Sequence, residues 1–234
     1  MRIGEIDVEI VRKKIKHFHL YVKPPYGEVS VSVPLATTDE NIRIFVEENI
    51  GWVVKKRQEV AEQPRLPKRK WVSGETVLVW GERYFLTVNR SLGRQYTVRL
   101  SGNRMELDVP PLSTSRSREA FMAEWYRNQL YPVAEEITHK WSKITGFNAE
   151  EVIIQKMTRC WGTCSIANAR IRLNLLLARQ PKEALEYIVL HELCHLRYKN
   201  HNKAFVALLD KYMPNWRDVK KRLREAPLDC IVEN

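Results

Sequence analysis

The chain has 234 residues, which is enough for one large domain or two small ones with a buried core. Apolar residues make up 44% and charged residues 29%, the balance of a water-soluble globular protein. No run of about 18 apolar residues occurs, so the sequence predicts no transmembrane helix and no membrane partner. Residues 1–14 lack the apolar core of a signal peptide, and we therefore expect a cytoplasmic protein.

The net charge of +11 favours anionic partners such as nucleic acid, nucleotides or acidic peptides. A solvated basic surface gives the same balance, so charge by itself does not select a partner. Nucleic-acid contact through the basic surface therefore stays one expectation among several.

The cysteines do not form a metal-binding pattern of their own. Cys160 and Cys164 make a C-x3-C pair, and no second pair follows at zinc-finger spacing. In a cytoplasmic chain these residues are predicted to be reduced thiols. A structural zinc site built from four cysteines is not expected.

The beginning of the chain indicates a β-hairpin followed by a helix. Apolar residues alternate with other side chains in 17–23 and 28–34, which predicts two strands joined by a short turn. Thr37 and Glu40 form a capping-box pattern, and the apolar stripe after them predicts a helix that continues to about Glu62.

A second set of strands follows a basic, proline-containing connector at 64–70. Alternation and glycine-containing turns predict two further hairpins, 75–80 with 83–88 and 95–100 with 104–109. Residues 1–110 are therefore expected to form a β-rich region with one helix.

The rest of the chain, residues 111–234, is predicted to be mainly helical. Apolar residues recur at helical spacing over 115–145, where Pro132 is expected to kink or split the helix. A strand is predicted at 170–177, a helix from Pro181 onward, and a last helix over about 203–212. The fold class is therefore α+β.

The segment HELCHLRYKNH, residues 191–201, carries the clearest chemistry. His191 and His195 are four residues apart, so on a helix both imidazoles lie on one face and can bind one metal ion. Glu192 lies about 100° around the helix, where it can reach a water molecule without being a ligand. This HExxH arrangement predicts a zinc site with Glu192 as the general base.

A catalytic zinc site needs a third protein ligand and one open position. His201 follows the predicted helix and is the preferred third ligand, because imidazole suits zinc and the spacing closes a short loop. A carboxylate of Asp210 or Asp218 is the alternative.

The motif contains two further residues of interest, Tyr198 and Cys194. Metzincins have a glycine where this chain has Tyr198, so the loop is expected to follow another path. The Tyr198 hydroxyl could reach the oxyanion, or the ring could simply pack at the helix end. Cys194 points away from Glu192 and is predicted to be a small buried packing residue.

Three blocks together resemble the YgjP-type metal-dependent hydrolases, which are relatives of the SprT and WLM-type zinc metallopeptidases. The blocks are RCWGTCS at 159–165, IRLN at 171–174 and LHELCHLRYKNHNKAF at 190–205. The resemblance extends to the first half, where a V-x-V-x-V-P strand precedes a helix that contains Trp52 and Lys55.

The resemblance implies a zincin-like, minimal gluzincin-like metallopeptidase core. It makes His191, His195 and His201 the ligands of Zn2+ and Glu192 the general base. Cys160 stands where the family has an arginine, and Thr163 replaces a serine, so the role of the Trp161–Ser165 block stays open between lining the cleft and packing.

Substrate contacts are expected upstream of the motif. Zincin-type folds place an exposed strand beside the active-site helix, where an extended peptide can add. Residues 170–174 are the candidate, with Arg172 and Asn174 facing the substrate; an interior strand is the alternative. Arg159 and Tyr198 complete the set of candidate substrate-binding residues.

Three functions remain open. The first is a zinc metallopeptidase that hydrolyses peptide bonds. The second is a metal-dependent nucleoside triphosphate pyrophosphatase acting for example on UTP, in which Arg159, Arg170, Arg172 and Lys156 hold phosphates. The third is a module that binds nucleic acid or another partner around a structural metal. Structural sites usually have four protein ligands, which disfavours the third.

Overall fold

The computed structural model describes residues 1–23, 26–62, 65–66, 69–157, 160–226 and 228–229. The chain divides into two compact units, residues 1–67 with 227–234 and residues 68–226, and each is described by itself. The mixed α+β class is confirmed.

The boundary between the units differs from the one predicted at residue 110. Strand residues Leu86 and Met105 share one buried cluster with helix residues Met122 and Tyr126. A common hydrophobic core therefore joins the second set of strands to the helices that follow it, and the units separate at the basic, proline-containing connector instead.

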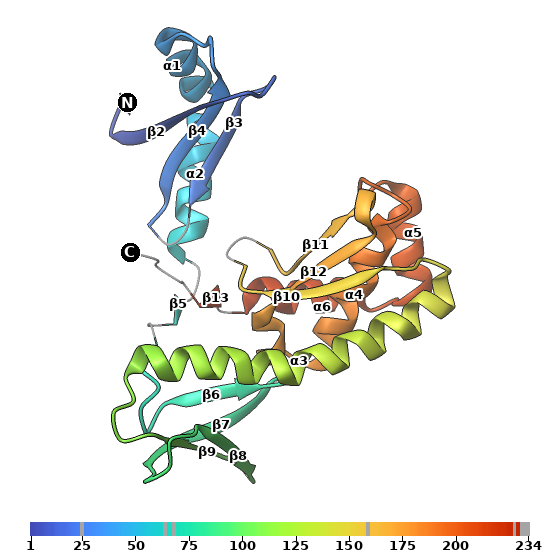
Figure 1. The fold of residues 1–234 in the computed structure, drawn as a ribbon. Coiled ribbons are helices and arrows are strands. Elements are labelled where there is room, and N and C mark those ends of the chain that lie inside the picture. Colours follow the sequence, from blue (N-terminus) through green and yellow to red (C-terminus); the bar gives the residue numbers. More distant parts are fainter. Residues whose placement is uncertain (24–25, 63–64, 67–68, 158–159, 227, 230–234) are drawn as a thin grey trace. The chain divides into compact units, whose positions relative to one another are not determined.

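The first unit is a four-stranded sheet with two helices. Its elements are β1 (Arg2–Ile3), β2 (Ile6–Lys13), β3 (His19–Lys23), β4 (Glu28–Pro34), α1 (Asp39–Glu48) and α2 (Ile50–Glu62) (Figure 1). The strand order is β1-β2-β4-β3; β3 and β4 form the predicted antiparallel hairpin, and β2 runs parallel to β4. Two short strands, β5 (Arg65–Leu66) and β13 (Leu228–Asp229), pair in parallel.

The helical part of the first unit differs from the prediction in two details. The N-cap of α1 is Thr38, whose side chain accepts a hydrogen bond from the Asn41 backbone, rather than Thr37. The single helix expected up to Glu62 is divided at Asn49. The Asn49 side chain donates to the Phe45 carbonyl over 2.8 Å and so competes with the helical backbone bonds.

The second unit begins with a four-stranded sheet against a long helix. Its first elements are β6 (Thr76–Val79), β7 (Glu82–Arg90), β8 (Thr97–Ser101), β9 (Arg104–Val109) and α3 (Ser115–Thr145). The two predicted hairpins are present as β6–β7 and β8–β9. Helix α3 continues through Pro132 and is not split there; buried residues such as Leu130 and Ala134 flank the proline and hold the helix by packing.

A smaller sheet and three helices complete the second unit. They are β10 (Glu151–Gln155), β11 (Gly162–Ser165), β12 (Arg170–Asn174), α4 (Lys182–His195), α5 (Lys203–Tyr212) and α6 (Trp216–Glu225), with short 3-10 helices η1 (Ile166–Asn168) and η2 (Leu175–Arg179). The sheet order is β10-β12-β11. The strand predicted over 170–177 ends at Asn174, because its side chain accepts a hydrogen bond from the Leu176 backbone and caps η2.

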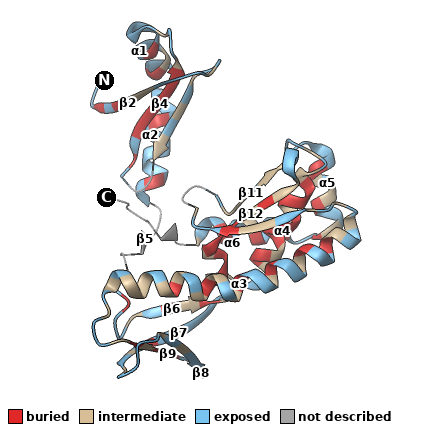
Figure 2. Ribbon diagram, in the orientation of Figure 1, coloured by how far each residue is buried: buried red, intermediate tan, exposed pale blue. Residues whose placement is uncertain are grey.

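Helix α4 is the most enclosed helix of this unit (Figure 2). It contacts α3, β11, β12, α5 and α6, which surround it on several sides. Among the described residues, no helix is both long and apolar enough to span a membrane. Because α4 is surrounded by these elements, the HExxH motif lies on a helix whose position is fixed by packing.

Candidate metal centre

The last turns of α4 carry the HExxH motif, and the residues around it are buried. Leu190, Leu193 and Cys194 are fully buried, and Glu192 is only 5% exposed. Burial raises the pKa of the Cys194 thiol to about 12, so this cysteine is neutral and packs as an apolar residue, as predicted.

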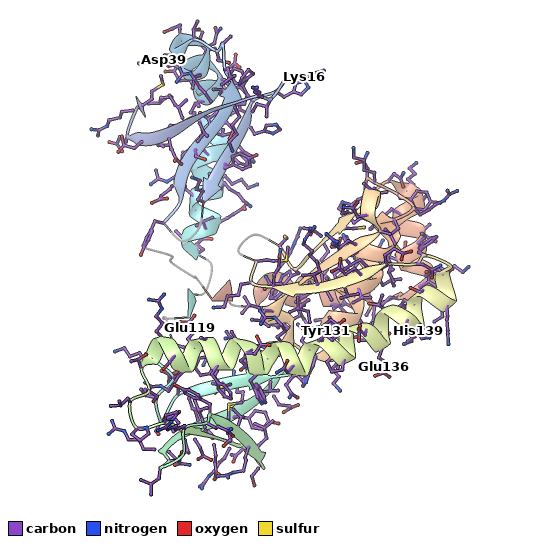
Figure 3. The ribbon with its side chains drawn as sticks, in the orientation of Figure 1. Lys16, Asp39, Glu119, Tyr131, Glu136 and His139 are labelled. Carbon is purple, nitrogen blue, oxygen red and sulfur yellow. The ribbon has the colours of Figure 1, made fainter. Side chains whose placement is uncertain are left out.

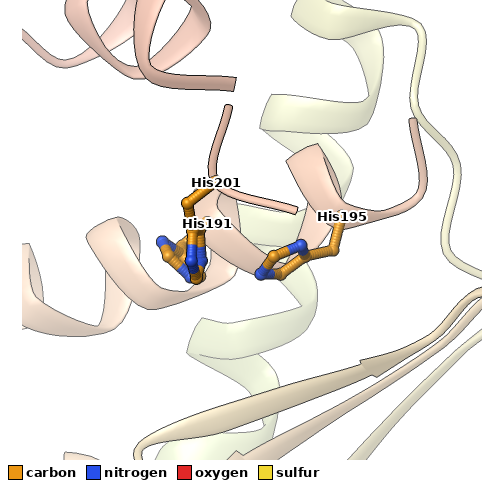
Figure 4. A group of neighbouring side chains, drawn as sticks. All are labelled: His191, His195 and His201. Carbon is orange, nitrogen blue, oxygen red and sulfur yellow. The ribbon is translucent and has the colours of Figure 1, made fainter. Parts of the chain in front are cut away.

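Three imidazoles converge at the end of this helix (Figure 4). The Nε2 atoms of His191 and His201 are 3.0 Å apart. The His195 ring centroid lies 4.9 Å from that of His191 and 4.8 Å from that of His201. One ligand atom from each ring falls within 4.8 Å of the others. Three ring nitrogens at this separation suit a single divalent cation.

The loop between α4 and α5 brings His201 back to the helix. The Nδ1 atom of His195 lies 3.0 Å from the Tyr198 carbonyl oxygen, which orients the ring and leaves Nε2 for a metal. Tyr198 thus acts here through its backbone, at the position where a metzincin has glycine. The Asn202 side chain caps α5 by accepting a hydrogen bond from the Phe205 backbone.

Phe205 forms an apolar support for the three rings. Its ring centroid lies 5.0, 4.8 and 4.7 Å from those of His191, His195 and His201. Phe205 itself is 1% exposed. Phe205 lies within the block at 190–205, but its spacing from the histidines does not by itself indicate this role.

The electrostatic surroundings keep the first histidine neutral. Burial, together with the nearby charges of His195, His201 and Lys220, lowers the pKa of His191 to about 3. The pKa of His201 is also lowered, mainly by burial. A neutral imidazole is the form that binds a metal, so the donor set fits a divalent cation.

Glu192 is placed in an apolar environment beside this group. Burial raises the pKa of its carboxyl to about 8. A carboxyl with a raised pKa can accept and return a proton near neutral pH, which general acid–base catalysis requires.

Strand β11 forms the wall next to Glu192, and sequence reasoning missed its key residue. A Cβ atom added to Gly162 would lie 2.8 Å from Oε1 of Glu192 and 2.8 Å from Cγ2 of Ile188. The pKa values of Cys160 and Cys164 are raised, first by burial and then by the charge of Glu192. The Trp161–Ser165 block therefore forms one wall of the site. The sequence signal for this role is Gly162, a glycine within a strand where no turn requires one.

The candidate substrate residues are placed differently from expectation. Strand β12 is the central strand of its sheet, so residues 170–174 have no free edge; the interior alternative is confirmed. Arg172 is half-buried in this strand, opposite Thr163 of β11. Arg159 lies outside the described residues.

Asn174 is occupied within the fold rather than presented to a substrate. Its side chain is buried, and its Nδ2 atom donates to the Met157 carbonyl over 2.8 Å and to the Cys160 carbonyl over 2.9 Å. Its Oδ1 atom accepts a hydrogen bond from the Leu176 backbone over 3.1 Å. Asn174 therefore anchors the segment that leads into β11.

A family model described as the YgjP-like metallopeptidase domain matches residues 16–226. None of the curated proteins gives a significant match. Among solved structures, the metallopeptidase zymogen of Pyrococcus abyssi abylysin is similar at 22% identity, with a TM-score of 0.37, over 38% of this chain and 90% of that one. The zymogen of Methanocaldococcus jannaschii jannalysin is similar at 24% identity, with a TM-score of 0.36, over 38% of this chain and 86% of that one.

Proposed function

Because the chain belongs to the YgjP-like metallopeptidase family and is therefore a metal-dependent hydrolase, we propose that it is a zinc peptidase with a zincin-like core. His191, His195 and His201 hold the zinc ion, and Glu192 is the general base. The observation that carries this proposal is the convergence of three imidazoles beside one buried carboxyl.

Each part of the site has a distinct task in peptide hydrolysis. Zinc, when bound, supplies Lewis-acid chemistry that acidifies water and polarises a carbonyl group. Glu192 accepts a proton from the attacking water and delivers it to the leaving amine. The Tyr198 carbonyl holds His195 in the orientation that exposes Nε2.

The edge of β11 is the place where an extended peptide would bind. The Trp161 carbonyl accepts a hydrogen bond from the Asn174 backbone over 2.9 Å. In an antiparallel ladder alternate residues bond the same neighbour, so Thr163, like Trp161, turns its backbone groups towards β12. Gly162 and Cys164 then direct theirs to the other side, where no described strand pairs with β11. This location replaces the strand at 170–174.

The phosphoanhydride alternative has less support from the described side chains. Of the four cations considered for phosphate binding, Lys156 pairs with Glu119 over 3.1 Å, and Arg170 pairs with Glu151. Arg172 is the described cation of that set for which no carboxylate partner is seen. An open strand edge suits an extended peptide better than a compact phosphate group.

Nucleic-acid contact is a separate proposal that belongs to the second unit. Residues 68–226 contain most of the chain's lysines and arginines, while acidic and basic residues nearly balance in residues 1–67. Phosphate binding to this surface would weaken steeply as salt is added.

In the test, the zinc-loaded protein is incubated separately with casein, with a peptide library and with nucleoside triphosphates. We expect peptide cleavage, and we expect Glu192→Gln to lower turnover by about 10²–10⁴-fold while zinc stays bound. Full turnover by Glu192→Gln would contradict the assigned mechanism. Cleavage of UTP without cleavage of any peptide would replace the peptidase with the pyrophosphatase.

A further inference from the structure

Gly162 of strand β11 lies so near Glu192 that the space between them has no room for a side chain. We propose that Gly162 is a positioning residue that fixes the direction of the Glu192 carboxylate; this inference rests on the proposed role of Glu192 as general base. The contact is steric, and it joins the two walls of the metal centre.

The need for glycine at this position is spatial rather than conformational. Six glycines of the described chain have a positive φ, and Gly162 is not among them. Its backbone lies within the regular β11–β12 ladder, opposite Leu173. An alanine could therefore adopt this backbone, but its Cβ would lie 2.8 Å from Oε1 and 2.9 Å from Cγ of Glu192.

The neighbours of this contact leave few ways to relieve the crowding. On the same added Cβ, Cγ2 of Ile188 would also lie at 2.8 Å. Gly162 cannot easily retreat, because Trp161 before it bonds the Asn174 backbone, and the Asn174 side chain holds the Cys160 carbonyl. The remaining adjustments are movements of the Ile188 and Glu192 side chains, and the second of these displaces the base.

The same residue also connects the base to the substrate. The alternation of the ladder directs the backbone groups of Gly162 to the free edge of β11, while its Cα faces Glu192. Gly162 would thus position both a peptide paired with this edge and the carboxylate of Glu192. Misplacement of a reacting group by about 1 Å can cost roughly 10²-fold in rate.

The first test is Gly162→Ala with Gly93→Ala as the matched control. At Gly93, which also has an ordinary φ, the nearest atom to an added Cβ is Oγ of Ser91 at 3.5 Å, an ordinary contact. We expect Gly162→Ala to lower kcat on a cleaved peptide by about 10²-fold, with KM and zinc affinity nearly unchanged. Equal kcat in both variants would overturn the proposal.

A second measurement separates positioning from general damage. In the Glu192→Gln background the base is already absent, so adding Gly162→Ala should leave the residual turnover unchanged. If the residual turnover falls again by the same factor, Gly162 acts on the fold rather than through Glu192, and the proposal is wrong.

A third readout is independent of any activity. Gly162→Ala should lower the thermal midpoint of the metal-free protein, and this shift should become smaller when Glu192→Ala removes Oε1 and Cγ from the crowded space. An equal shift in both backgrounds would refute the steric coupling. Because this measurement needs no substrate, it distinguishes failure of the positioning role from failure of the peptidase proposal.

Discussion

Helix α4 and strand β11 form two walls of the candidate metal centre, and they contribute in opposite ways. Helix α4 carries the proposed functional side chains, which are His191, Glu192 and His195, among buried neighbours. Strand β11 provides a backbone edge and, at Gly162, the absence of a side chain. Functional side chains can be recognised in a sequence by residue type and spacing. Unpaired backbone groups cannot, because they depend on which strand lies at the edge of the sheet.

The largest effect is expected from His195→Ala, which removes one of the three converging imidazoles. Removal of one imidazole leaves two protein ligands, so we expect loss of stoichiometric zinc and of all peptide turnover. Metal analysis after dialysis measures the first and a peptide assay the second. The matched control is His139→Ala, because His139 is exposed on α3 (Figure 3) and is not one of the three histidines that converge. Retained zinc in His195→Ala would remove this residue from the ligand set.

The support that Asn174 gives to the segment before β11 can be removed with Asn174→Asp. The new carboxylate loses two donated hydrogen bonds and faces the Met157 and Cys160 carbonyls instead. We expect the free energy of unfolding to fall by about 1–3 kcal/mol and turnover to fall while zinc stays bound. Chemical denaturation measures the first change. Asn168→Asp, on the exposed surface after β11, is the control and should have neither effect. A substrate-contacting Asn174 would instead change KM without changing stability.

The edge itself can be tested through the substrate. Replacing one peptide N–H of a cleaved substrate by an ester oxygen removes a single donor, and one lost hydrogen bond is worth about 1 kcal/mol, or roughly fivefold in kcat/KM. Because Gly162 and Cys164 alternate with Thr163 along β11, the loss should appear at alternate substrate positions. Uniform sensitivity at every position would contradict strand addition.

The same contrast explains how much of the fold could be predicted. Helices α3, α4 and α5 were expected because apolar residues recur at helical spacing within them. Helix α6 was missed although Trp216, Val219 and Leu223 form its buried stripe, because charged residues occupy most other positions. The connector at 64–70 was recognised, but the unit boundary was placed at 110 because a shared core cannot be seen from local patterns.

The smaller sheet was harder to predict for a different reason. Strand β11 has four residues, three of them glycine or small polar residues, and shows no alternation of apolar side chains. Its position depends on the side chain of Asn174 and on pairing with β12, both of which are tertiary interactions. The role of residues 161–165 therefore stayed open in the sequence, and so did the choice between an edge and an interior strand at 170–174.

The smallest effect is expected at Tyr198, where side chain and backbone can be separated directly. The backbone carbonyl orients His195, so Tyr198→Phe should keep zinc affinity and change kcat/KM by less than about twofold, since the ring still packs against the core. A loss of about 10²-fold in kcat alone would instead match the removal of a donor to the oxyanion. That result would return the Tyr198 hydroxyl to the catalytic residues and would make the α4–α5 loop, like α4, a source of side-chain chemistry.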